Sequence, residues 1–444
     1  MTGSSALLTD RYELTMVDAA LTAGTHDREC VFEAFARHLP NGRRYGIVAG
    51  TGRLLELIQR FRFDDEQLSW LREAEVVRQP TLDWLADFRF HGDISGYREG
   101  EVYFPGSPIL VVDAPFAEGV MLETLILSVF NYDSAVASAA ARMVSAANGR
   151  PVAEMGSRRT NEDAAVAAAR AAYIAGFSAT SNLEAGRTWG IPTMGTAAHS
   201  FTLLHDTEEG AFRAQVAALG TDTTLLIDTF DIRTAIDTAI AVAGPGLGAV
   251  RIDSGDLPSL VRSVRAQLDA LGATGTKITV TNDLDEHAIA ALSASPVDSY
   301  GVGTSVVTGS GAPAAGMVYK LVAHRDGTSG GGPGGWISVA KKSADKVNVG
   351  GRKRPFRRLN EAGTAVAEII HSGGDRAESA DTGRPLLVPL VNQGVVNPAF
   401  LGATGVVAAR DHRAAAIAEL PAVAFRLGRG DPVLPSVYDA PTVA

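Results

Sequence analysis

The chain has 444 residues, of which 46% are hydrophobic and 20% are charged, and it carries a formal net charge of −10 at pH 7. This composition is typical of a globular protein and excludes an extensively disordered one, while the length predicts two domains. The acidic balance argues against a nucleic-acid partner.

The cysteine content and the hydropathy predict where the protein works. Cys30 is the single cysteine, which excludes an intramolecular disulfide framework and is typical of a reducing cytoplasm. The first residues lack the basic and apolar regions of a secretory signal, and no uninterrupted apolar run is long enough to span a bilayer. We therefore expect a cytoplasmic protein without a membrane partner.

Residues 1–115 mix helical and strand patterns without a repeating unit, which predicts an α+β domain. A helix is expected to open at Thr9–Glu13, with Asp10 or Thr9 as the N-cap, because Leu14 and Val17 follow on one apolar face. The range Cys30–Ala36 alternates loosely between faces and is typical of a strand.

Residues 116–325 begin with two apolar helices and continue as a series of short strands, each followed by a connection long enough for a crossover helix. Thr160 and Asp163 resemble a capping box for the helix after the first of these strands. The seven expected strands lie at 152–155, at 177–180, from 191, and at 223–227, 249–252, 277–280 and 299–302.

This series is compatible with an open doubly wound sheet or with a barrel. A barrel is favoured because polar residues end every strand, whereas an open sheet concentrates its ligand groups at one switch point. The predicted fold class is therefore α/β, with an irregular parallel α/β barrel over 116–325. The N-terminal α+β domain, 1–115, is expected to be completed by C-terminal segments, 336–444, that pack back on it.

A basic run at Arg352–Arg358 is the main local exception to the acidic balance. It contains one aromatic residue and follows two glycines, which suits a small phosphate better than a polymer. A solvated charged edge is an equally good interpretation of most of these side chains.

His199 is the most informative histidine of the chain, because it follows a predicted strand and lies between Thr196 and Ser200. A histidine at a helix start that bonds to the backbone is the ordinary alternative. In a parallel α/β fold, however, the carboxyl ends of the strands form the active face. The pattern therefore predicts a general base, a metal ligand or a phosphoryl acceptor, and the residues alone do not choose among these.

Arg251 and Asp253 lie two residues apart on a predicted strand and therefore on the same face of it. Arginine offers a planar fork to a carboxylate or a phosphate, and aspartate can accept from sugar hydroxyls or bind Mg²⁺. A buried structural ion pair between the two is the alternative.

The first and last predicted strand ends add groups suited to a phosphorylated sugar. Gly303 and Thr304 supply small residues and backbone donors at the position where barrels often bind phosphate, and Arg158 lies at the first strand end.

At these residues the sequence closely resembles the nicotinate phosphoribosyltransferase family, which are type II phosphoribosyltransferases. The resemblance covers most of the chain, and its motifs in this order are highly specific. They are Leu8–Met16, Phe32–Pro40, Glu154–Arg159, Gly195–Ser200, Arg251–Leu257 and Gly301–Ser305.

The resemblance implies a reaction in which nicotinate attacks C1 of phosphoribosyl pyrophosphate, giving nicotinate mononucleotide and pyrophosphate with Mg²⁺ present. It also implies that ATP hydrolysis is coupled to this ligase-type reaction of NAD salvage through a phosphohistidine. By motif position His199 is that histidine.

The resemblance further implies roles for the remaining site residues. Thr196 and Arg251 would contact nicotinate, and Ser181 takes the place of an aspartate found in nicotinamide-using relatives. The phosphoribosyl group would be bound by Arg158, Asp253, Gly303 and Thr304. Tyr12 resembles the residue that reaches across a homodimer, with shared active sites, to stack on the pyridine ring.

The sequence departs from the family pattern at two places. Met155 stands where a phenylalanine commonly forms the other side of the ring sandwich, and Gly350 takes the place of a proline before the basic run. Two other functions are compatible with most of the motifs: a nicotinamide phosphoribosyltransferase, and a non-catalytic sensor of nucleotides. The intact His199, Arg251 and Asp253 argue against the sensor.

Overall fold

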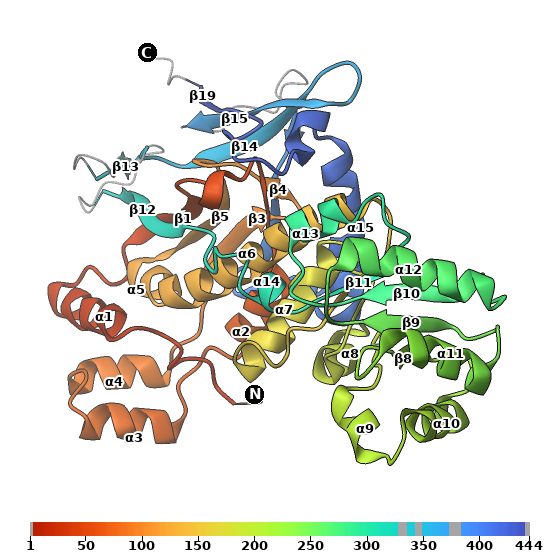
Figure 1. Ribbon diagram of the computed structural model, residues 1–444. Helices are drawn as coiled ribbons and strands as arrows, with labels where there is room; N and C mark the ends of the chain where they lie inside the picture. Colours follow the sequence, from red (N-terminus) through yellow and green to blue (C-terminus); the bar gives the residue numbers. More distant parts are fainter. Residues whose placement is uncertain (1–2, 327–334, 342–348, 373–382, 440–444) are drawn as a thin grey trace. The chain divides into compact units, whose positions relative to one another are not determined.

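The computed structural model describes residues 3–326, 335–341, 349–372 and 383–439 (Figure 1). The chain forms two compact units: the first consists of Met1–Ala135 and Ala314–Ala444, and the second of Val136–Pro313. The boundaries thus differ from the predicted 115/116 and 325/336. Residues 314–325 belong to the first unit because they supply strand β12 to its sheet.

The first unit is built on an antiparallel sheet to which N-terminal and C-terminal segments contribute. Within the described residues the strand order is β13-β12-β1-β5-β3-β17-β18. The C-terminal strand β17 pairs antiparallel with β3, and β12 pairs antiparallel with β1. The bounds are β1 (Glu29–Ala36), β3 (Asp93–Tyr97), β5 (Pro108–Pro115), β12 (Met317–Arg325), β13 (Trp336–Ser338), β17 (Leu387–Asn392) and β18 (Val395–Val396).

Apolar side chains explain why these elements form. Strand β1 is buried along nearly its whole length, and Phe32 stacks on Tyr319 of β12 with ring centroids 5.2 Å apart. The predicted N-terminal helix is present as α1 (Arg11–Ala23), with Leu14 and Val17 buried. Asp10 occupies its N-cap position but makes no side-chain capping bond.

The other elements of the first unit cover this sheet or form two smaller sheets, β2-β4 and β16-β14-β15-β19. They are β2 (Gly46–Ile47), α2 (Thr51–Gln59), α3 (Asp65–Glu73), α4 (Gln79–Ala86), β4 (Val102–Tyr103), α5 (Phe116–Val120), β14 (Lys353–Leu359), β15 (Ala365–Ser372), β16 (Arg384–Pro385), α15 (Gly402–Ala418), β19 (Ser436–Tyr438) and the short 3-10 turns Pro40–Gly42, Pro398–Phe400 and Ala422–Phe425.

The basic run is exposed only in part: Arg352, Arg354 and Arg358 are exposed, as expected of a solvated charged edge. It forms β14, and the side chains of Lys353 and Arg357 are fully buried. Lys353 pairs with Glu33 at 2.6 Å, and Arg357 pairs with Glu368 at 2.6 Å. Both predicted interpretations are therefore wrong for these two residues, which anchor C-terminal strands inside the first unit.

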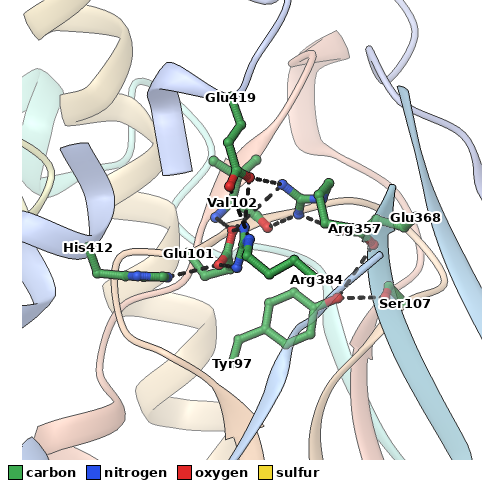
Figure 2. Close-up of polar contacts among 9 residues, drawn as sticks. All are labelled: Tyr97, Glu101, Val102, Ser107, Arg357, Glu368, Arg384, His412 and Glu419. Atoms are coloured by element: carbon green, nitrogen blue, oxygen red, sulfur yellow. Dashed lines mark hydrogen bonds and ion pairs between the residues drawn. The ribbon is translucent and has the colours of Figure 1, made fainter. Parts of the chain in front are cut away.

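A larger ionic cluster surrounds Arg357 (Figure 2). Glu101 accepts from Arg384 at 2.8 Å and bonds to His412 at 2.8 Å, and Arg384 also donates to Glu419 at 2.7 Å. We call Glu101, Arg357, Arg384 and their partners in Figure 2 the ionic cluster. It joins the turn before β4 to four C-terminal elements, β14, β15, β16 and α15.

The long helix α6 (Glu123–Ala147) connects the two units. By its length and composition alone, the helical segment Phe116–Ala147 could cross a membrane, in contrast to the prediction that no apolar run is long enough. However, 67% of its most apolar window is buried in the protein, as in the core helix of a soluble protein.

The second unit is a parallel α/β unit with the strand order β7-β6-β11-β10-β9-β8 within the described residues. The strands are β6 (Val152–Glu154), β7 (Ala179–Thr180), β8 (Thr224–Leu226), β9 (Ala249–Ile252), β10 (Lys277–Val280) and β11 (Ser299–Val302). The helices are α7 (Glu162–Ile174), α8 (Leu183–Trp189), α9 (His199–Leu204), α10 (Glu208–Leu219), α11 (Ile232–Ala243), α12 (Leu257–Ala270), α13 (Glu286–Ala291) and α14 (Thr304–Val307).

This unit and the N-terminal unit completed by C-terminal strands confirm the predicted fold class, with two local corrections. The strand expected from Ile191 is reduced to an isolated bridge between Thr193 and Thr180, because Pro192 has no N–H to donate to a ladder. The N-cap of α7 is Asn161 rather than Thr160: its side chain accepts from the backbone N–H groups two and three residues on.

Candidate active site

The predicted site residues of the second unit lie at or after the carboxyl ends of its parallel strands, which meet at one edge of the sheet. The structure brings four of them into direct or near contact: Thr196, His199, Arg251 and Asp253. Each belongs to a segment whose strand or helix fixes its backbone.

Arg251 lies on β9 and its side chain is 13% exposed. The guanidinium donates to the hydroxyls of Thr196 at 2.7 Å and Thr281 at 3.0 Å, to the carbonyl of Ala197 at 3.3 Å, and to Asp253 at 3.3 Å. The alternative of a structural Arg–Asp ion pair is therefore realised. These four bonds leave one of the five arginine N–H donors for a ligand.

Both carboxylate oxygens of Asp253 accept hydrogen bonds, Oδ2 from Arg251 and Oδ1 from the next strand end. Its Oδ1 accepts from the hydroxyl of Thr281 at 2.6 Å and from the backbone N–H of Asn282 at 3.0 Å. The side chain remains 33% exposed. Because both oxygens are fixed by donors, the carboxylate keeps one orientation at the end of β9.

His199 is the first residue of α9, and its side chain is 41% exposed. The Nδ1 atom is 3.1 Å from the hydroxyl of Thr229, while Nε2 is 3.8 Å from Asp228 and 4.0 Å from Asp253. The ordinary alternative, a histidine bonded to the backbone, is not what the structure has. The imidazole is instead held by side chains that follow strands β8 and β9.

Asp228 and Thr229 are site residues that sequence reasoning did not single out. The side chain of Asp228 is 1% exposed, and its Oδ2 accepts from the backbone N–H of Asp253 at 2.8 Å and from Ser254 at 2.7 Å. Its Oδ1 is buried and has no hydrogen-bond partner among the described residues. The sequence did contain a local signal, because this pair follows β8 as Asp253 follows β9.

The first loop of the site follows β6. Glu154, the last residue of β6, is buried, and burial raises the pKa of its carboxyl group. Arg158 lies exposed in this loop. Met155 packs its side chain so closely on Gly301 that a β-carbon at Gly301 would lie 2.6 Å from the Met155 sulfur.

The other predicted residues lie at neighbouring strand ends or elsewhere. Ser181 is exposed after β7, and Gly303 and Thr304 follow β11. Tyr12 lies on α1 of the first unit with 45% of its surface exposed, and burial, followed by the charge of Glu123, raises its pKa to about 12. Ligand contacts of these four residues stay predictions.

Residues 7–131 match the family model described as the nicotinate phosphoribosyltransferase N-terminal domain. The chain is 55% identical to nicotinate phosphoribosyltransferase pncB1 of Mycobacterium tuberculosis (strain CDC 1551 / Oshkosh), over 97% of this chain and 95% of that protein. It is 36% identical to nicotinate phosphoribosyltransferase of Bacillus subtilis (strain 168), over 84% and 76% of the two chains.

Solved structures agree in fold. Human nicotinic acid phosphoribosyltransferase superposes with a TM-score of 0.80 at 24% identity, covering 97% of each chain. A nicotinate-nucleotide pyrophosphorylase from Pyrococcus furiosus superposes with a TM-score of 0.75 at 22% identity, covering 96% of each chain. Because the chain is 55% and 36% identical to these two bacterial relatives, it belongs to the nicotinate phosphoribosyltransferase family.

Proposed function

We propose that this protein is an ATP-coupled nicotinate phosphoribosyltransferase of NAD salvage. Nicotinate, phosphoribosyl pyrophosphate, ATP and water would give nicotinate mononucleotide, pyrophosphate, ADP and phosphate. The observation that carries the ATP-coupled part is the environment of His199, a half-exposed imidazole supported by a hydroxyl and two carboxylates at the strand ends.

The phosphoryl step uses His199 as the nucleophile. When Nδ1–H donates to Thr229, the lone pair on Nε2 is free to attack the γ-phosphorus of ATP. A bond from Nε2 to phosphorus forms, the bond from phosphorus to the β,γ-bridging oxygen breaks, and ADP leaves. Water later cleaves the N–P bond and releases phosphate. Asp228 and Asp253 stabilise the positive charge that the imidazole gains in the attack.

The transfer step needs positioning more than a strong base. The ring nitrogen of nicotinate attacks C1 of the ribose as the bond from C1 to pyrophosphate breaks, so positive charge grows on the sugar. Thr196 and the remaining N–H of Arg251 are suited to the nicotinate carboxylate. Arg158, Asp253, Gly303 and Thr304 are suited to the phosphoribosyl group.

Mg²⁺ fits this arrangement as a companion of the phosphates. The described residues contain no group of three or more metal-ligating side chains. Mg²⁺ is usually held by one or two carboxylates together with substrate phosphates. Asp228, whose buried Oδ1 has no hydrogen-bond partner among the described residues, and Asp253 are the carboxylates available beside His199. When bound, the ion would neutralise phosphate charge as the leaving group departs.

We further propose a cytoplasmic homodimer with shared sites, in which Tyr12 stacks on the pyridine ring bound by the partner. In the segments that carry His199 and Thr229, Leu203, Leu204 and Phe230 have exposed fractions of 63%, 77% and 61%. Large apolar side chains exposed in this way are typical of a surface that another protein covers.

The test is release of pyrophosphate from phosphoribosyl pyrophosphate with nicotinate, nicotinamide or quinolinate, with and without Mg-ATP. We expect release with nicotinate, stimulation by ATP, and ADP formation in step with nicotinate mononucleotide. Equal use of nicotinamide, or no release with any base, would contradict the proposed function.

A further inference from the structure

Glu154 has a buried carboxylate without a cationic partner among the described residues. The residue is fully buried at the last position of β6. A carboxylate inside a protein is costly unless it is paired with a cation or its oxygens are hydrogen-bonded. The reason for this buried acid must therefore lie in the groups that its oxygens hold.

Each carboxylate oxygen of Glu154 holds a different loop. Oε1 accepts from the backbone N–H of Gly156, at the start of the turn that carries Arg158. Oε2 accepts from the hydroxyl of Thr180 at 2.6 Å, and Thr180 ends β7 directly before Ser181. One side chain thus connects the two loops that follow β6 and β7.

Further hydrogen bonds close this connection into a ring. The backbone N–H of Asn182 donates to the Thr180 hydroxyl at 2.9 Å, and its side-chain amide donates to Ser157 in the first loop at 3.0 Å. The N–H of Ser181 donates to the carbonyl of Glu154 at 2.8 Å. Thr180 is itself fully buried, so the ring is protected from water on this side.

We propose that Glu154 is a positioning residue that fixes the Arg158 loop relative to the Ser181 loop, and so aligns the phosphoribosyl group with the pyridine base. This inference rests on the proposed function, from which it takes the roles of Arg158 and Ser181. Glu154 does not touch substrate, because its side chain is fully buried.

The variant Glu154→Gln conserves volume and can still accept from Gly156. Its amide group, however, donates rather than accepts, so the Thr180 hydroxyl loses the acceptor of its proton and only a reversed, uncharged and weaker bond joins the two side chains. Thr180→Val removes the bond to Glu154 from the other side, together with the bond from the Asn182 N–H to the Thr180 hydroxyl. Thr180→Ser keeps the hydroxyl and is the conservative rescue.

A matched control is Thr223→Val. Thr223 is a nearly buried threonine whose hydroxyl also makes a side-chain hydrogen bond, accepting from Gln215 at 2.9 Å. It precedes β8 and thus lies at the opposite end of the sheet from the site. It therefore measures the effect of removing a buried hydroxyl without disturbing the two loops.

The experiment measures KM for nicotinate and for phosphoribosyl pyrophosphate, kcat, and thermal unfolding for all variants. We expect Glu154→Gln and Thr180→Val each to raise both KM values and to lower kcat/KM by about tenfold. The double variant should be no worse than Thr180→Val alone, because that variant already removes the bond that Glu154→Gln weakens. Thr180→Ser and Thr223→Val should keep the wild-type KM values.

Unchanged KM values in a folded Glu154→Gln protein, or the same kinetic change in Thr223→Val, would overturn the proposal. If Glu154→Gln does not fold, the comparison of Thr180→Val with Thr180→Ser decides, and equal KM values in these two also overturn it. A wild-type protein that fails to release pyrophosphate with nicotinate contradicts the proposed function instead, so the two failures are distinguishable.

Discussion

Replacing Glu101 by glutamine should destabilise the first unit strongly, because this carboxylate is at the centre of the ionic cluster (Figure 2). Burial alone raises the pKa of a carboxyl group, but hydrogen bonds from His412 and Arg384 and the nearby charge of Arg357 outweigh it. They lower the pKa of Glu101 from 4.5 to about 2. At about 1.36 kcal/mol per unit, this corresponds to roughly 3 kcal/mol of folding free energy at neutral pH.

The sign of this contribution is fixed by the direction of the shift. The folded pKa is below the unfolded value, so the stabilisation is complete above about pH 4.5 and is lost as the pH falls toward 2. Removing one partner from a buried ionic group typically costs about 3–5 kcal/mol, which agrees with the free energy derived from the pKa. The destabilisation caused by Glu101→Gln should therefore shrink between pH 5 and pH 3.

The assay is urea unfolding of wild type and variant at pH 7, 5 and 3. A matched control is Glu29→Gln, since Glu29 forms an exposed ion pair of 2.6 Å with Arg325 in the same unit. Exposed pairs contribute about 0–1 kcal/mol, so this variant should change little. A loss below about 1 kcal/mol for Glu101→Gln at pH 7, or a loss equal to that of the control, would refute the reasoning.

Three further predictions concern the site. Labelling of the protein by γ-labelled ATP should be absent in His199→Ala. It should be at least roughly tenfold slower in Asp228→Asn, because this variant removes a negative charge beside Nε2 of His199. Equal labelling of wild type and His199→Ala would contradict the role of His199. Ser181→Asp should lower kcat/KM for nicotinate by at least roughly tenfold, or ~1.4 kcal/mol, because two like charges would meet; unchanged kinetics would count against this account of base selection. Mixing inactive Tyr12→Ala and His199→Ala subunits should restore some activity, and no recovery with confirmed hybrid dimers argues against shared sites.

Local sequence patterns were sufficient to predict the parallel unit and much of its site. Short apolar strands that end in polar residues are visible in the sequence, and Arg251, Asp253 and His199 lie where this pattern put them. Asp228 gave the same signal and was not singled out, because a single aspartate at a strand end has many structural uses. Its role becomes visible only through its 3.8 Å approach to His199.

Features that depend on distant partners could not be predicted in this way. Nothing near Lys353 or Arg357 in the sequence indicates that their carboxylate partners include Glu33, 320 residues away, and Glu368 on the neighbouring strand. A basic run is ordinarily exposed, so the pattern favoured a surface. Burial was decided by the pairing of β14 with β15 and β16 and by its packing against N-terminal residues such as Glu33, which no local window contains.

The pairing of β17 with β3 has a consequence for the order in which the protein becomes folded during synthesis. Tyr97 pairs with Leu387, and Cys30 pairs with His324, so the neighbours in this sheet are separated by roughly 290 residues. At about 5–20 residues per second, a ribosome needs roughly 15–60 s to supply the missing strands. The continuous second unit, Val136–Pro313, can form meanwhile. Until β12 and β17 are synthesised, one edge of β1 and one edge of β3 have no partner strand. A chaperone, or another nascent chain, would meet these edges first.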